Sequence, residues 1–124
     1  MTDHQHELVE QSLISGLAYS AMGEFNKARE SYNTAVEAFP RYFFVRFQLI
    51  EVLLELDEYD ETKVHLDFLL DINKDSDLAN FYLAKLLFKI DNFSKVYLIK
   101  LGSFFFPLLG TGAKNGLSVS INTL

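Results

Sequence analysis

The chain has 124 residues, 49% of them hydrophobic, with a formal net charge of −6 and no cysteine. This length fits one domain, and the negative charge argues against a nucleic-acid-binding surface, which needs clustered lysine and arginine. The lack of cysteine excludes disulfides, thiolate metal sites and cysteine nucleophiles.

The polar N-terminal segment, residues 1–8, is predicted to be unstructured, as chain termini usually are. The opening sequence MTDHQHELVEQ has neither the basic region nor the apolar stretch of a secretory signal. Together with the absence of cysteine, this favours a cytoplasmic location. His4 and His6 could chelate a metal weakly, but a disordered start is the simpler interpretation, so we predict no metal site.

A recurring pattern follows. The segments GEFNKA, DEYDET and DNFSKV are variants of one another, and their aromatic residues Phe25, Tyr59 and Phe93 stand 34 residues apart. A fixed period of this length indicates stacked helical units. We expect a first unit at residues 9–42, a second at 43–76 and a degenerate or partial third at 77–102.

Each unit is predicted to contain two antiparallel helices joined by a tight turn. Apolar residues recur at steps of three and four, as in an amphipathic helix with a wide apolar face. The turns are expected at Gly23, Asp57 and Asp91. Gly23 suits the left-handed conformation that closes a helix, and Pro40 cannot continue one. Gly16 should let the two helices of the first unit approach closely.

The first unit resembles a tetratricopeptide repeat. The residues that carry the resemblance are a small residue, an aromatic, a turn glycine, then alanine, aromatic, alanine and proline: Gly16, Tyr19, Gly23, Ala28, Tyr32, Ala35 and Pro40. Ser12 and Ser15 stand where the family has tryptophan and leucine. The resemblance covers about Val9 to Leu101 and implies an all-α fold, a right-handed superhelical stack of antiparallel helix pairs.

The resemblance also implies that the first helix of each unit lines a concave face that binds peptides. By position, that face holds Leu13, Leu17, Phe44, Phe47, Glu51, Leu54, Glu55, Leu78, Phe81, Lys85, Phe88 and Lys89. Such an aromatic strip would accept a peptide with apolar anchor side chains. The alternative is that some of these aromatic residues pack in the core.

One class of family partner is excluded by the same positions. Family members that clamp the C-terminal carboxylate of heat-shock chaperones use lysine, arginine and asparagine on this face. Here the corresponding residues are Leu13, Leu17, Gln48, Leu78 and Tyr82. The cationic clamp is therefore missing.

No residue pattern predicts catalysis, a metal site or a cofactor. His65 has no nucleophile or carboxylate partner in register, and acid–base work needs an oriented partner. Glu51 and Glu55 lie one helical turn apart, as solvent-facing charges commonly do. The segment GTGAKNG lacks the lysine–serine/threonine ending and preceding strand of a phosphate-binding loop. We therefore predict a non-enzyme.

The tail, residues 103–124, is predicted to be irregular. No acidic residue follows Asp91, and the tail SFFFPLLGTGAKNGLSVSINTL contains one proline and three glycines. Its apolar run is too short to span a bilayer. Three alternatives stay open: an irregular cap over the last helix, a membrane-surface or self-association patch, or a variant end replacing the third repeat.

Two functions follow from these patterns. The first is a protein–protein interaction module that binds a peptide in the concave face. The alternative is a structural subunit that self-associates through an uncapped C-terminal end near residues 104–106. The acidic stretch at residues 57–77 is either a solvated helix face or a docking site for a basic partner.

Overall fold

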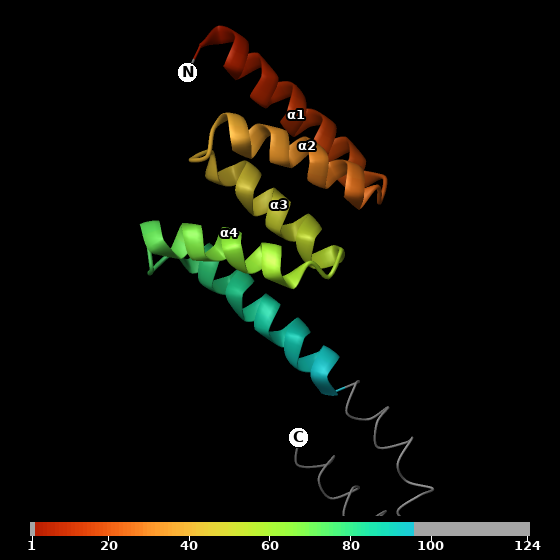
Figure 1. Ribbon diagram of the computed structural model, residues 1–124, viewed down its shortest axis with the longest axis vertical. Coiled ribbons are helices and arrows are strands. Elements are labelled where there is room, and N and C mark those ends of the chain that lie inside the picture. The colour runs from red at the N-terminus through yellow and green to blue at the C-terminus, as the bar shows by residue number, and fades with distance from the viewer. Residues whose placement is uncertain (1, 96–124) are drawn as a thin grey trace, which may run out of the picture. The chain divides into compact units, whose positions relative to one another are not determined.

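The structure, a computed structural model, describes residues 2–95, and all regular structure within them is helical. The helices are α1 (Asp3–Ala21), α2 (Phe25–Ala38), α3 (Phe43–Glu55) and α4 (Tyr59–Ile72), followed by a helical segment at residues 77–95. Helices α1 to α4 pack on one another in chain order (Figure 1). The all-α prediction is confirmed for this part of the chain. No helix in it is both long and apolar enough to cross a membrane.

The described residues belong to two compact units, Met1–Leu86 and Leu87–Leu124. The predicted tail at residues 103–124 and the last residues of the predicted third repeat lie outside the described part.

The N-terminal segment is helical from Asp3, so the prediction of an unstructured start over residues 1–8 is wrong. Thr2 forms a capping box with Gln5. The Thr2 hydroxyl accepts a hydrogen bond from the Gln5 backbone N–H at 3.2 Å, and the Thr2 N–H donates to the Gln5 side-chain oxygen at 3.0 Å. This reciprocal pairing satisfies N–H groups that a helix start otherwise leaves without partners.

The turns after α1 and α3 have the same backbone geometry. Gly23 and Asp57 both have positive φ, at 76° and 57°. After α1, the N–H of Glu24 donates to the carbonyl of Tyr19 at 2.8 Å, and that of Gly23 to Ser20 at 3.1 Å. After α3, the backbone N–H groups of Glu58 and Asp57 donate hydrogen bonds in the same pattern. Both helices therefore end in a Schellman motif, in which a left-handed residue satisfies the last carbonyls.

The third expected turn, at Asp91, is absent, because the helical segment runs without a break over residues 77–95. Asp91 instead forms an ion pair with Lys95, one turn later in the helix, at 3.2 Å, an arrangement that supports a continuing helix. Phe25 and Tyr59 pack partly buried against the core, whereas Phe93 is 65% exposed. The turn geometry is thus shared by Gly23 and Asp57, and the expected third turn at Asp91 is not found.

Helix α3 is the centre of the core. Val45, Leu49 and Leu53 join buried residues of α1 and α2 in one hydrophobic cluster. Ile50 and Leu54 face the other way, into a second cluster with α4 and the start of the segment at residues 77–95. Because its side chains are buried in two directions, α3 fixes the positions of the helices on both of its flanks.

Candidate functional site

The predicted peptide-binding residues fall into three groups by exposure. Five apolar side chains are open to solvent: Leu17, Phe44, Leu78, Phe81 and Phe88, between 40% and 65% exposed. Leu13 and Phe47 are partly buried and pack against the two core clusters.

Leu54 does not belong to the accessible face. It is 1% exposed, because α3 is covered on this side by α4 and by the segment that starts at residue 77. A bound peptide could not reach it in this structure. Its assignment to the binding face is therefore corrected.

Phe88 and Lys89 lie in the second compact unit, Leu87–Leu124. Phe88 is 65% exposed. The other predicted residues belong to the first unit, and the site described below is built from that unit alone.

A pocket of about 310 Å³ brings the end of α1 and the start of α2 together with α3. Its lining residues are Ser20, Phe25, Gln48, Glu51, Val52 and Glu55. Residues 48 and 52, and likewise residues 51 and 55, are one helical turn apart, so these four residues of α3 form one wall of the pocket. Glu51 and Glu55, both expected on the binding face, lie in the same pocket.

Glu51 also links α3 to the segment at residues 77–86. The Tyr82 hydroxyl donates to one Glu51 oxygen at 2.5 Å, and the Lys85 ammonium lies 3.4 Å from the other. The ring of Phe47 stacks on the ring of Tyr82, with centroids 5.7 Å apart. The ring of Phe81 meets the Tyr82 ring edge-on, with centroids 5.2 Å apart. Burial, together with the Glu51 carboxylate, raises the pKa of Tyr82, so its hydroxyl stays a donor. Helix α3 and residues 77–86 therefore share this face.

A second pocket, of about 370 Å³, lies between α1 and α2. It is lined by Leu8, Gln11, Ser12, Ser15, Glu30, Ser31 and Thr34. Ser12, Ser15, Ser31 and Thr34 have small side chains, and the lining is mostly polar.

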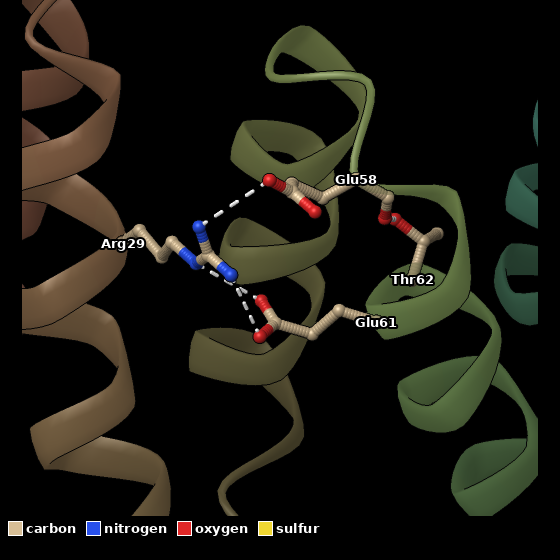
Figure 2. A network of polar contacts seen from close by, with 4 residues as sticks. All are labelled: Arg29, Glu58, Glu61 and Thr62. Carbon is tan, nitrogen blue, oxygen red and sulfur yellow. Dashed lines mark hydrogen bonds and ion pairs between the residues drawn. The ribbon is translucent and has the colours of Figure 1, made fainter.

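Arg29 ties the two helix pairs together (Figure 2). Its guanidinium, on α2, binds the Glu61 carboxylate of α4 through two bonds, at 2.9 and 3.1 Å, and lies 3.7 Å from Glu58. The Thr62 hydroxyl donates to the Glu58 carbonyl at 2.7 Å. A planar guanidinium suits such two-point binding. This cluster holds α4 against α2.

Arg46 and His65 form a buried pair that the sequence did not reveal. Arg46, 6% exposed, donates to His65 Nδ1 at 2.8 Å and to the Pro40 carbonyl at 2.8 Å, with its guanidinium 3.9 Å above the Phe68 ring. Its Nε has no hydrogen-bond partner among the described residues. Because arginine can only donate, His65 Nδ1 must accept, which requires a neutral ring.

The surroundings of His65 also favour the neutral ring. Burial first, and the nearby Arg46 charge second, lower the pKa of His65, while Glu61 opposes them. The bond between Arg46 and His65 links α3 to α4. The only hint in the sequence was an arginine inside the apolar run FFVRFQLI.

Within residues 2–95, no three acidic or histidine side chains come close enough together to hold a metal ion. Comparison with protein-family models, with curated protein sequences and with solved structures gave no match.

Proposed function

We propose that this protein is a non-enzymatic interaction module, whose helix pairs stack as in tetratricopeptide repeats in a right-handed superhelix. The face made by α1, α3 and residues 77–86 binds a peptide segment with apolar anchor side chains. The observation that carries this proposal is the exposure of Leu17, Phe44, Leu78 and Phe81 at positions where the family binds peptides.

Two physical features support this function. Full burial of a phenylalanine or leucine contributes about 1.5–3 kcal/mol, so covering a few of these side chains gives a useful driving force. Glu51, Tyr82 and Lys85 hold α3 and the neighbouring segment together across this face. A surface that is already ordered loses little entropy when a partner binds.

The test is a double variant with a matched control. Phe44→Ala with Phe81→Ala should greatly reduce retention of peptides selected from a random displayed library, without loss of helicity by circular dichroism. Val64→Ala is the control, because Val64 is 66% exposed but lies on α4. Equal binding by the double variant and the control would overturn the proposal.

A second candidate function is self-association through the second unit. Leu87, Phe88 and Phe93 are between 56% and 65% exposed, and exposed apolar side chains that form a contiguous patch would suit a contact surface. Sedimentation of the full chain at two concentrations tests it. A monomer at both concentrations would exclude this function and leave the first one unaffected.

A further inference from the structure

We propose that the peptide bound at this face carries a lysine or arginine whose side chain enters the pocket formed by Ser20, Phe25, Gln48, Glu51, Val52 and Glu55. The inference rests on the proposed function and adds the chemistry of one anchor residue. It is carried by the shape of the pocket, the kinds of atom that line it and the contacts that Glu51 already makes.

The pocket has the size and lining for a long basic side chain. Its volume, about 310 Å³, is at the lower end of the range for small-ligand sites, about 300–1,000 Å³. Phe25, which is partly buried, offers apolar surface for the methylene stem, and the Glu51 and Glu55 carboxylates offer acceptors for the charged head. Lysine and arginine commonly divide their contacts in this way.

Glu51 already accepts an ammonium group from within the chain. Lys85 Nζ lies 3.4 Å from one of its oxygens, and both side chains are more than a third exposed. At this length the ion pair is loose, because strong charged hydrogen bonds are about 2.7–2.9 Å. The short bond from Tyr82 fixes the Glu51 carboxylate. Glu51 is therefore an oriented acceptor that a better-placed cation could use.

Glu55 supplies the second carboxylate. It is exposed and lies four residues after Glu51 on α3. Two like charges at this spacing repel each other weakly. A cation bound between them would relieve that repulsion. An acidic side chain in the same pocket would add to it, and an uncharged one would leave it unchanged, so charge complementarity selects a basic anchor.

The experiment selects peptides from a random displayed library on the full-length protein. We expect lysine or arginine at a fixed distance from the apolar anchors. For one selected peptide with an acetylated N-terminus, replacing that residue by norleucine should weaken binding about tenfold, as charge pairs at interfaces commonly do. Acetylation removes the terminal ammonium, the other source of the same chemistry.

Protein variants locate the contact. In Glu55→Gln the tenfold difference in affinity between the basic and norleucine peptides should shrink, because Glu51 is then the one charged acceptor left among the pocket's lining residues. Glu37→Gln, which makes the same charge change at an exposed position of α2, should keep the tenfold difference. If the difference between the two peptides fell by the same amount in Glu55→Gln and Glu37→Gln, the inference would be overturned. That result would indicate a general attraction of basic peptides to an acidic protein.

The outcomes separate this inference from the proposed function. Selected peptides that lose binding to Phe44→Ala with Phe81→Ala, but show no basic preference, would overturn the basic anchor alone. Failure to select any peptide would overturn both.

Discussion

The ring of Tyr32 occupies the space where a side chain of residue 16 would lie. A Cβ at Gly16 would meet three ring carbons of Tyr32, the farthest of them at 2.9 Å, and Tyr32 is fully buried. Glycine is therefore required in α1 by the packing of an aromatic side chain from α2.

We expect Gly16→Ala to destabilise the protein. Overpacking costs about 1–3 kcal/mol, which exceeds the gain of about 1 kcal/mol that alanine brings to a helix interior. The net loss should be about 1 kcal/mol, measured by denaturant unfolding. In a Tyr32→Leu background, which shortens the opposing side chain, the same change should be neutral or stabilising. An equal loss in both backgrounds would show that Tyr32 is not the cause.

Gly23 should respond to substitution for a different reason. Its φ is +76°, and nothing lies within 4 Å of a Cβ built there. Gly23→Ala should cost about 1–2 kcal/mol through backbone strain alone. Gly23→Asp should cost less, because Asp57 has a similar φ in the equivalent turn and aspartate tolerates this conformation better. Thermal unfolding of both variants tests this order, and equal losses would contradict it.

Much of the fold could be predicted because its signals are local. A left-handed residue such as Gly23 and a helix-ending one such as Pro40 act on backbone within a few residues of themselves, and the apolar spacing identifies each helix. The third turn was mispredicted because the segment DNFSKV resembles DEYDET in composition. In the structure Asp91 and Lys95 sit one turn apart on an unbroken helix.

The candidate site was harder to predict, because burial depends on helices that are distant in sequence. Phe44 and Leu54 share the apolar pattern of α3, yet one is 49% exposed and the other 1%. Which of them is covered is decided by α4 and by residues after 76. The pair of Arg46 and His65 likewise forms only when two helices pack, and no spacing rule within one helix identifies it.

The bond between Arg29 and Glu61 should contribute modestly to stability (Figure 2). Their side chains are 28% and 34% exposed, so solvent weakens the attraction, and removing the pair should cost about 0.5–1 kcal/mol. Arg29→Lys should lose most of this amount, since lysine cannot make the two-point contact. The loss should shrink as salt is added, which unfolding at two ionic strengths measures.

A double-mutant cycle isolates this interaction. Combining Arg29→Lys with Glu61→Gln should cost less than the sum of the single changes. Lys63→Gln is the control, because the ion pair between Lys63 and Asp67 is more than 60% exposed within one helix. Lys63→Gln should lower the free energy of unfolding by less than Arg29→Lys does. Simple additivity in the cycle would mean that Arg29 and Glu61 do not stabilise each other.

Stability should fall with decreasing pH because of His65. Burial and the Arg46 charge lower the pKa of His65 in the folded state, whereas in the unfolded chain it is about 6.5. Above about pH 6.5, His65 is unprotonated in both the folded and the unfolded chain. Below it the unfolded state binds a proton that the folded state does not, so the free energy of unfolding declines until the pH reaches the lowered folded pKa.

The variant His65→Gln separates this effect from other titrations. Its side-chain oxygen can still accept the bond from Arg46, but it does not titrate, so the decline that begins near pH 6.5 should be reduced. His4→Gln, at an exposed position, should keep the wild-type decline. Chemical unfolding at a series of pH values measures all three proteins. A decline of the same size in His65→Gln and wild type would mean that protonation of His65 does not oppose folding, and that Arg46 tolerates a charged neighbour.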